Sequence, residues 1–367
     1  MHTKRLSILL PFLTILVTAA VSAAPQHSSN QLQPIRTLTA NQTEVAAENY
    51  KKYCALCHGK NRQGYANDHA PSLRSRSLFE SGIPHAVLRP LSYGRQGTAM
   101  GGYLDEVGGP MSLSETWDLT YWLFEQSGAE RVYLSTNPVS GDIARGQQVY
   151  EKECATCHGE KGEGVTAPAL ANQSALAHNT DEFIRHAIVN GRNDTQMNAF
   201  AGKLSADDID NVTAFLRSRA SGWKMEKPVL RQLPTADQYI INPQGADPDF
   251  KLTNNLYVSS KDLFAALNAQ QRMVLLDTRV TSVWQRAHIQ GSFPLPYYAD
   301  FDAIVAELPK DVQIIAYCSC PRAAADSVIA VLRRRGYSRT AVLYEGIFGW
   351  MNLGYPVMRS DLVENTD

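Results

Sequence analysis

The sequence predicts a multidomain protein in which two all-α domains are followed by an α/β domain with a parallel sheet. A segment with helical periodicity occurs twice, about one hundred residues apart. In the last third of the chain, short apolar runs alternate with helical ones, which is typical of a parallel sheet covered by helices. The length of 367 residues leaves room for two to three domains at about 150 residues each.

The composition predicts a globular protein that does not bind nucleic acid. Hydrophobic residues make up 44% of the chain and charged residues 19%, so packed cores can form. The net charge is −1, and the basic residues form no long run that could follow a phosphate backbone.

The N-terminus has the features of a secretory signal peptide. Lys4 and Arg5 precede an apolar run, and small residues before Ala23 provide a cleavage site, so residues 1–23 are predicted to be removed. An uncleaved anchor is the alternative, but the run is short for a bilayer span and contains Pro11. We expect a periplasmic protein with no membrane span after signal cleavage.

The six cysteines form three close pairs rather than a disulfide framework. Their positions are Cys54 and Cys57, Cys154 and Cys157, and Cys318 and Cys320. Pairs this close cannot connect distant parts of a fold, so their spacing favours site chemistry.

The first two pairs belong to an internal repeat. The stretch 53–59 recurs as 153–159, each time after a predicted short helix, over 47–53 and 146–153. Each copy continues to a methionine in a loop and then to an amphipathic helix that begins with a possible capping box. The boxes are Ser112 with Glu115 and Ser205 with Asp208, and the expected apolar stripes are Leu113, Trp117, Tyr121 and Phe124, and Ile209, Val212 and Leu216.

Each repeat contains a CxxCH motif, which marks covalently attached c-type haem. Two thiols at this spacing can form thioethers with the two vinyl groups of one haem, and the adjacent histidine then faces the iron. A zinc site or a redox dithiol is the alternative, but neither explains why both copies also have a histidine and a methionine. The sequence therefore predicts two haem c groups.

With these motifs, residues 42–221 resemble two class I cytochrome c domains, over 42–135 and 136–221. The resemblance implies a small helical fold around each haem, with a histidine and a methionine as axial ligands. The implied ligands are His58 and Met100 for the first iron, and His158 and Met197 for the second. It also implies that the carbonyl groups of Pro71 and Pro168 orient the two histidines.

The distal ligand of the first haem has alternatives. An insertion over 102–110 separates Met100 from the final helix, which makes Met111 a competing ligand, and His69 or His85 could also replace Met100. Two axial ligands leave no open position on the iron, so we expect each haem to transfer electrons between a periplasmic donor and an acceptor such as a cytochrome or an oxidase.

The stretch 222–250 is rich in proline and lacks periodicity, so it is predicted to be a linker. Beyond it, apolar runs and helical patterns alternate in the order of an α/β domain. Predicted strands cover 273–276, 314–317 and 341–344, and predicted helices cover 260–268, 301–308 and 322–335.

Cys318 follows a predicted strand and precedes a predicted helix, where ligands bind in α/β sheets. Backbone N–H groups at such a turn can stabilise a thiolate, a persulfide or an anion. An inert buried thiol is the alternative.

Residues 251–360 resemble a rhodanese-like domain. The resemblance rests on Leu275-Leu276-Asp277-Thr278-Arg279, on His288-Ile289-Gln290-Gly291-Ser292, and on the closing segment that includes Trp350. It implies that Cys318 carries a sulfane sulfur as a persulfide and that Arg322 attracts an anion such as thiosulfate or polysulfide. The loop after Cys318 departs from the family pattern, because it is one residue shorter, lacks glycine and contains Pro321. Cys320 is either a resolving thiol or a spectator.

Three functions follow from this organisation. In the first, electrons from the oxidation of a sulfur compound at Cys318 pass to the haems. In the second, the protein is a dihaem electron carrier whose rhodanese-like domain is catalytically silent and serves for binding or sensing. In the third, a sulfurtransferase carries haems that take no part in its reaction.

Overall fold

The computed structural model describes residues 35–65, 67, 69–221, 230–319 and 322–359. Residues Leu32–Asp367 form one compact unit. The predicted signal peptide, residues 222–229 of the predicted linker, and Cys320 lie outside the described residues. Within the described part of the chain, no helix is both long enough and apolar enough to cross a bilayer.

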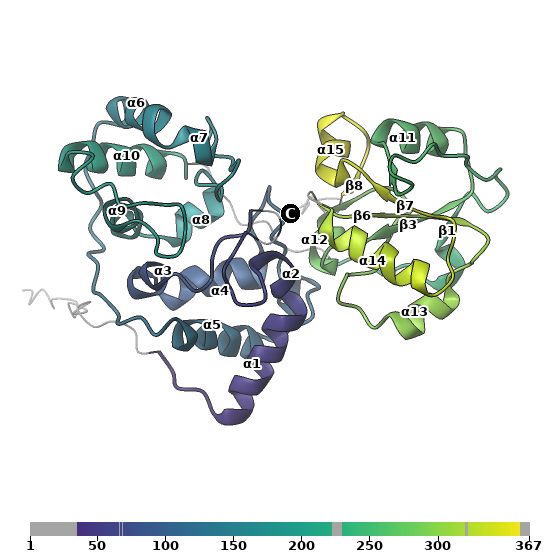
Figure 1. Ribbon diagram of the computed structural model, residues 1–367, viewed down its shortest axis with the longest axis horizontal. Helices are drawn as coiled ribbons and strands as arrows, with labels where there is room; N and C mark the ends of the chain where they lie inside the picture. Colours follow the sequence, from purple (N-terminus) through teal and green to yellow (C-terminus); the bar gives the residue numbers. More distant parts are fainter. Residues whose placement is uncertain (1–34, 66, 68, 222–229, 320–321, 360–367) are drawn as a thin grey trace, which may run out of the picture. The chain divides into compact units, whose positions relative to one another are not determined.

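The front half of the chain is helical (Figure 1). Its first segment contains α1 (Ala40–Tyr53), α2 (Ala55–His58), α3 (Arg76–Ser81), α4 (Pro84–Tyr93), the 3-10 helix η1 (Asp105–Val107) and α5 (Leu113–Ser127). Its second segment contains α6 (Ile143–Glu153), α7 (Ala155–His158), α8 (Gln173–His178), α9 (Asp181–Asn190) and α10 (Ala206–Ser218). The helices before the two CxxCH motifs are longer than the sequence predicts, because Thr39 and Asp142 cap them further upstream.

The first and last helices of each segment pack together, α1 on α5 and α6 on α10. In the second segment this contact is very close at Gly146, where an added Cβ would lie 2.0 Å from the carbonyl oxygen of Asn211. Of the two predicted capping boxes, that of Ser112 with Glu115 is complete, whereas Ser205 accepts from the amide of Asp208 without the return bond.

The apolar stripe predicted for α10 is buried. Of the stripe predicted for α5, only Phe124 is buried. Leu113 is 50% exposed, whereas Thr116 and Thr120 are completely buried. Both threonines donate their hydroxyl hydrogen to a carbonyl of the preceding turn, Thr116 to Leu113 at 2.8 Å and Thr120 to Thr116 at 2.8 Å. Because this bond satisfies the hydroxyl locally, the two threonines share the buried face with Leu119, Trp122 and Leu123. The predicted stripe is therefore displaced around the helix.

The third region is an α/β domain whose sheet is mixed, not parallel as predicted. Its strands are β1 (Ile240–Ile241), β2 (Tyr257–Val258), β3 (Met273–Asp277), β5 (Phe293–Pro294), β6 (Gln313–Tyr317) and β7 (Thr340–Leu343), in the order β1-β3-β6-β7-β2 with β5 also on β3. All pairs are parallel except β1 with β3, which is antiparallel. Strand β1 comes from the stretch predicted as a linker, where a two-residue strand has no detectable period. A separate antiparallel pair joins β4 (Ala287–His288) to β8 (Met358–Arg359).

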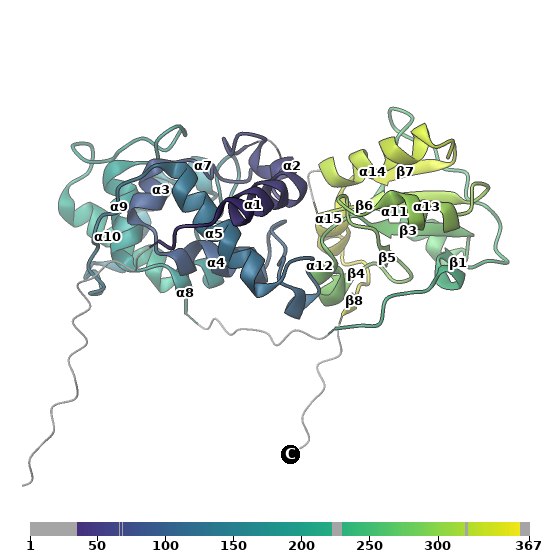
Figure 2. The ribbon, with the colours of Figure 1, turned by 90° about the horizontal axis from the view of Figure 1, so that it is seen from below.

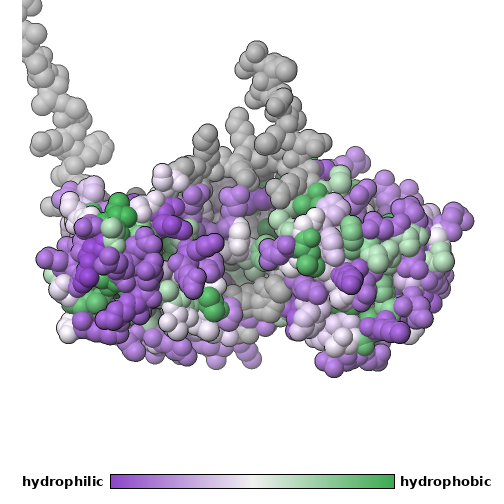
Figure 3. Space-filling view, turned by 90° about the horizontal axis from the view of Figure 1, so that it is seen from above, coloured by the Kyte–Doolittle hydropathy of each residue, from purple (hydrophilic) through white to green (hydrophobic). Residues whose placement is uncertain are grey.

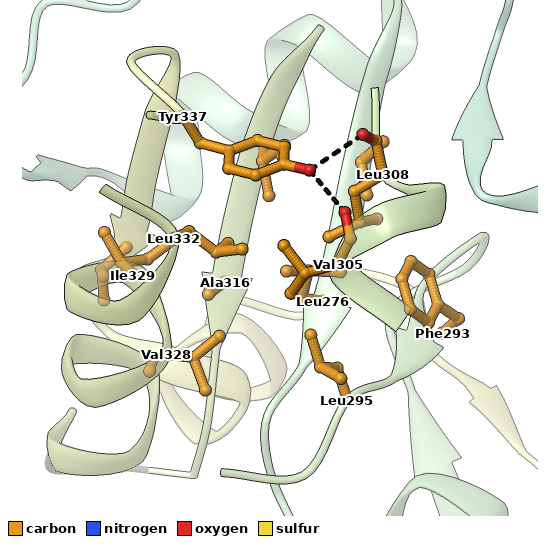
Figure 4. Close-up of a cluster of buried hydrophobic side chains, with 14 of the residues drawn as sticks. Leu276, Phe293, Leu295, Val305, Leu308, Ala316, Val328, Ile329, Leu332 and Tyr337 are labelled. Atoms are coloured by element: carbon orange, nitrogen blue, oxygen red, sulfur yellow. Dashed lines mark hydrogen bonds between the residues drawn. The ribbon is translucent and has the colours of Figure 1, made fainter. Parts of the chain in front are cut away.

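Helices cover both faces of this sheet (Figure 2). They are α11 (Ser260–Asn268), α12 (Thr281–Arg286), α13 (Phe301–Glu307), α14 (Ala323–Arg334) and α15 (Gly346–Asn352). Alternate strand residues face α13 and α14 on one side and α11 and α15 on the other. Figure 4 shows the first of these two cores, where the Tyr337 hydroxyl donates to the carbonyl groups of Val305 and Leu308.

The surface visible in Figure 3 is mostly hydrophilic, and its hydrophobic residues occur in small separate groups. Large exposed hydrophobic side chains come from many different elements, among them Leu113, Val165 and Leu353. Scattered exposure of this kind is normal for a globular protein.

Candidate functional site

The two CxxCH motifs have the same backbone geometry. In each, one helical turn follows the first cysteine, whose carbonyl accepts from the histidine amide at 2.9 Å for His58 and 3.0 Å for His158. The glycine after each histidine has a positive φ, 82° at Gly59 and 87° at Gly159, which turns the chain away from the motif. Tyr50 and Tyr150 donate to the carbonyl groups of these glycines at 2.7 and 2.8 Å.

Both histidines are oriented through Nδ1, as the resemblance implies. The Nδ1 atom of His58 lies 2.8 Å from the carbonyl oxygen of Pro71, and that of His158 lies 2.8 Å from the carbonyl oxygen of Pro168. A carbonyl can only accept, so Nδ1 carries the proton and Nε2 keeps its lone pair for a metal. Burial lowers the pKa of both histidines, although the proline carbonyl opposes this, so the rings are neutral as iron ligation requires.

The four motif cysteines fit thioether formation better than zinc binding. They are thiols in this structure, and burial raises the pKa of Cys54 to about 12 and that of Cys154 to about 11. Among the described residues, no three His, Cys, Asp or Glu side chains gather where a metal ion could be held.

Met100 and Met197 lie in loops of the same construction. Each loop follows a glycine that ends a helix, and its first amide, from Arg95 or Arg192, donates to the methionine carbonyl at 2.7 or 2.8 Å. The methionine amide in turn donates to the hydroxyl of Thr98 or Thr195, two residues earlier. A Cβ on the glycine, Gly94 or Gly191, would lie 2.6 or 2.5 Å from the methionine carbonyl oxygen, so each loop needs glycine at that position.

Met111 has the environment of a core residue. An isolated β-bridge pairs it with Leu104, and the matching bridge in the second segment pairs Leu204 with Ala201. Met111 is therefore the counterpart of Leu204. The first segment has four more residues than the second between its two bridge partners. Met111 is completely buried in the first hydrophobic core, whereas Met100 is partly exposed.

The two histidines that could replace Met100 lie elsewhere. His69 is exposed, and His85 packs edge-on against Trp117 with ring centroids 5.1 Å apart. The position of Met100 in a loop shared with Met197 makes it the better candidate.

Comparison with known proteins agrees with this geometry. One stretch of the chain is 36% identical over 92 residues to cytochrome c6 of Synechococcus sp., covering 24% of this chain and 80% of that protein. Cytochrome c6 of Diacronema lutheri is 37% identical over 84 residues, covering 22% of this chain and 99% of that protein. The chain belongs to the cytochrome c family.

Two domain families match this cytochrome. Residues 141–216 match the family "Cytochrome C oxidase, cbb3-type, subunit III", and residues 260–353 match the rhodanese-like domain. The cbb3-type oxidase subunit CcoP of Rubrivivax gelatinosus is 24% identical over 204 residues, covering 54% of this chain and 62% of that protein. A rhodanese-like domain from Anabaena sp. is 23% identical, covering 30% of this chain and 86% of that one, with a TM-score of 0.27. This cytochrome is an electron carrier with a C-terminal rhodanese-like domain, and its relatives imply covalently bound haem c.

Cys318 lies directly after β6, at the carboxyl end of the parallel strands, and is buried. Its carbonyl accepts from the amide of Ile347 at 2.9 Å, which holds the start of α15 against the cysteine. A Cβ at Gly346 would lie 2.7 Å from the Cys318 carbonyl oxygen and 2.4 Å from that of Ser319, and Gly346 has a φ of 59°. The close approach therefore depends on glycine at this position.

Arg322 is engaged by two tyrosines. Its guanidinium stacks on the rings of Tyr257 and Tyr344, at 4.8 and 4.3 Å from their centroids, and donates to the carbonyl of Tyr344 at 3.1 Å. The two rings lie 5.6 Å apart at 77° to each other, so they do not enclose the group from both sides, and its Nε has no hydrogen-bond partner among the described residues. The anion-binding role predicted for Arg322 stays a prediction.

Arg279 is a cation near Cys318 that the sequence analysis did not single out. Its guanidinium is buried and forms an ion pair with Asp277 at 2.5 Å. Burial opposes the charge, but Asp277, Tyr317 and Cys318 raise the pKa of Arg279, so it stays protonated. The signal was available in the sequence, because Asp277 and Arg279 flank the strand end that was assigned only as a family motif.

Two surface hollows lie on the rhodanese-like domain, and neither is lined by Cys318. One, of about 510 Å³, is bordered by Trp284, His288 and Arg231. The other, of about 590 Å³, is bordered by Phe250 and Arg333.

Proposed function

We propose that this cytochrome is a periplasmic dihaem electron carrier that accepts electrons from the oxidation of a sulfur compound at Cys318. The signal peptide over 1–23 accounts for export, and the cytochrome domains extend over 42–135 and 136–221. The observation that carries the dihaem proposal is the duplicated ligand geometry. His58 with Met100, and His158 with Met197, have the same hydrogen-bonded supports.

Reciprocal contacts between the two segments support electron exchange between the haems. The side chain of Asn172, just beyond Pro168, donates to the carbonyl of Gln96 in the loop of Met100, at 2.7 Å. Conversely, Ser77, just beyond Pro71, donates its amide to the side chain of Asn193 in the loop of Met197, at 2.9 Å. The proline side of each haem site therefore meets the methionine loop of the other.

Arg192 anchors this contact between the segments. Its guanidinium donates to the carbonyl of Ser77 at 2.6 Å and stacks on Phe183 at 4.8 Å from the ring centroid. Burial lowers its pKa to about 10, although Glu80 opposes this, so the side chain is charged at neutral pH.

The sulfur step needs two one-electron acceptors. When the Cys318 thiolate forms an S–S bond with the terminal sulfur of thiosulfate, two electrons leave and no proton is released. Two haem c groups supply these two acceptors when bound. Arg279 supplies a fixed positive charge near Cys318 that stabilises the thiolate.

The names of the relatives support the choice of electron partners. The relatives include cytochromes c6 and CcoP, a subunit of a cbb3-type cytochrome c oxidase. We infer that electrons leave this protein to a soluble cytochrome or to a terminal oxidase.

The test is the reduction of the oxidised holoprotein by thiosulfate or polysulfide, followed by the haem absorbance. We expect reduction in the native protein and none in Cys318→Ser, while ascorbate reduces both proteins and so shows that the haems are competent. Absence of reduction in the native protein, or unchanged reduction in Cys318→Ser, contradicts the proposal.

The engagement of Arg322 by Tyr257 and Tyr344 favours a second candidate function. In this alternative, the rhodanese-like domain is catalytically silent and serves for binding or sensing, because its anion-attracting group is held by two tyrosine rings and the Tyr344 carbonyl. Mass spectrometry after thiosulfate treatment distinguishes the two, since a sulfur adduct on Cys318 rules out a silent domain.

A further inference from the structure

Four tyrosines form a cluster where the first CxxCH segment meets the rhodanese-like domain. Tyr53 immediately precedes Cys54, and Tyr103 follows Met100 by three residues, while Tyr297 and Tyr298 come from the loop after β5. Tyr298 packs edge-on against Tyr53, with ring centroids 4.8 Å apart. The rhodanese-like domain therefore touches residues on both the cysteine side and the methionine side of the first haem site.

The carbonyl of Tyr53 is the centre of the cluster. It accepts from the hydroxyl of Tyr297 and, at 3.1 Å, from the hydroxyl of Tyr103. Burial raises the pKa of Tyr103 and Tyr297 well above the usual value, so both phenols keep the proton that they donate. The amide bond of this carbonyl leads directly to Cys54.

From Tyr297 the hydrogen bonds continue to the cysteine of the rhodanese-like domain. The amide of Tyr297 donates to the carbonyl of Thr278 at 3.1 Å, and the amide of Thr278 donates to the carbonyl of Tyr317 at 2.9 Å. That carbonyl is joined by its peptide bond to Cys318. Covalent bonds and hydrogen bonds therefore connect Cys318 to Cys54 without interruption.

Further contacts join the first CxxCH segment to the rhodanese-like domain. The hydroxyl of Ser282 donates to the carbonyl of Gly102 at 2.6 Å, and Arg286 donates to the carbonyl of Tyr93 at 3.2 Å. Val280 is buried in the same hydrophobic core as Tyr53. A Cβ at Gly101 would lie 2.1 Å from the side chain of Val280, so the contact needs a residue without a side chain there.

The second segment has different residues at the matching positions. Glu153 stands where the first segment has Tyr53, and Phe200 stands where it has Tyr103. Glu153 forms an ion pair with Lys203 at 2.6 Å, and the ammonium group of Lys203 also lies over the ring of Phe200, at 5.0 Å from its centroid. The second haem site therefore lacks the tyrosine cluster.

We propose that the haem attached at Cys54 and Cys57 is the one that receives electrons from Cys318, and that Tyr297 is the positioning residue that couples the two. This inference rests on the proposed function and names the route within it. Each of the two electrons released as the S–S bond forms reduces a ferric iron, the first haem receiving both in turn and passing one to the second. Electrons tunnel better through bonds and short hydrogen bonds than through gaps, and the phenol bridges the two centres without being oxidised.

The first test is Tyr297→Phe in the full-length holoprotein, which removes the hydroxyl that reaches the Tyr53 carbonyl and keeps the ring. We expect reduction of the haem by thiosulfate to slow severalfold. The matched control is Tyr298→Phe, because Tyr298 is the adjacent residue and contacts Tyr53 through its ring. We expect the control to keep the native rate, and equal rates in the two variants contradict the inference.

The second test uses proteins that retain one haem. Cys154→Ala/Cys157→Ala keeps only the first haem and should still be reduced by thiosulfate. Because one haem accepts one electron, the second electron passes to the oxidised haem of another molecule of the variant. Cys54→Ala/Cys57→Ala keeps only the second, which thiosulfate should leave oxidised although ascorbate reduces it. Reduction of Cys54→Ala/Cys57→Ala by thiosulfate at the native rate overturns the inference.

A third measurement tests whether Tyr297→Phe slows electron transfer to the haem or instead impairs the reaction of Cys318 with thiosulfate. With ferricyanide added as an external oxidant, mass spectrometry should find the same thiosulfate adduct on Cys318 in Tyr297→Phe as in the native protein. A smaller adduct in the variant would place the effect at the cysteine and contradict the inference. If the native protein is not reduced at all, the proposed function fails; if reduction depends on Cys318 but shows no preference between the haems, only this inference fails.

Discussion

The two CxxCH segments have the same local geometry and different surroundings. Around each histidine, the bond to the proline carbonyl and the bond from the buried tyrosine match to within about 0.1 Å in length, and the next glycine has a positive φ in both segments. Yet the residue before the motif is a buried tyrosine in one segment and an ion-paired glutamate in the other. The comparison teaches that a short motif is enough to set the local geometry of its histidine, while the residues beside it decide what the motif contacts.

The largest expected effect tests whether the two segments are equivalent as haem sites. Cys54→Ala/Cys57→Ala and Cys154→Ala/Cys157→Ala should each remove one haem, so that the ratio of haem to protein falls by half in either variant. Haem absorbance against protein concentration measures this ratio. If one variant keeps the native ratio, that segment does not carry haem.

The next effect tests the four additional residues of the first segment. Because Met111 is completely buried, Met111→Ala should lower the free energy of unfolding by about 2–5 kcal/mol and leave the iron–sulfur absorbance band intact. Met100→Ala should instead remove the iron–sulfur band and lower the free energy of unfolding by less than Met111→Ala does. Loss of the band in Met111→Ala would make Met111 the ligand, and Met111→Leu controls for the side-chain volume.

Tyr50 and Tyr150 test whether the two CxxCH segments, which share their geometry, also share the stability that each buried hydrogen bond contributes. Tyr50→Phe and Tyr150→Phe each leave a glycine carbonyl without its buried donor, which should cost about 1–3 kcal/mol in either segment. Denaturant unfolding followed at the haem absorbance measures both. A cost confined to one segment would show that the shared geometry does not carry shared energetics.

The smallest effect concerns the helix caps. Ser112→Ala and Ser205→Ala should each cost about 1 kcal/mol of the free energy of unfolding. The carboxyl groups three residues after these caps, those of Glu115 and Asp208, differ in the cause of their lowered pKa. Burial opposes ionisation of Glu115, but hydrogen bonds from Ser112 lower its pKa, whereas a hydrogen bond from Arg145 is the main cause of the lowered pKa of Asp208.

These lowered pKa values set the direction of the pH dependence. A carboxyl group whose pKa is lower in the folded protein adds stability above its unfolded pKa of about 4, and this contribution is lost as the pH falls through the folded value. We expect added salt to weaken the contribution of Asp208, which depends on an ion pair with Arg145, more than that of Glu115. Acid unfolding curves of Glu115→Gln and Asp208→Asn at low and high salt measure the difference.

Much of the fold follows from patterns that local physics imposes. The strand and helix order of the rhodanese-like domain was predictable because buried strands and amphipathic helices each have a fixed period, and α11 has the predicted bounds of 260–268. The buried face of α5 was misplaced although Leu119, Trp122 and Leu123 mark it, because Thr116 and Thr120 share it and satisfy their hydroxyl groups within the helix. Strand β1 was also missed, since two residues carry no period and it forms only by pairing with β3.

The residues of the candidate site also fall into those that the sequence predicts and those that only the fold brings together. The motif cysteines, both histidines and the methionine loops could be found from sequence because each is built by residues close together in the chain. The stacking of Arg322 on Tyr257 and Tyr344 could not, because the three residues are far apart in sequence and meet only in the folded domain.

By itself, the sequence determined that this chain has two CxxCH segments and a rhodanese-like domain with a cysteine at the end of a strand. Only the tertiary structure decided which segment meets that domain, through Tyr53, Tyr103, Tyr297 and Tyr298. The physical reason is that contacts within a motif depend on a few adjacent backbone angles. A contact between residues more than two hundred positions apart depends instead on how whole surfaces pack.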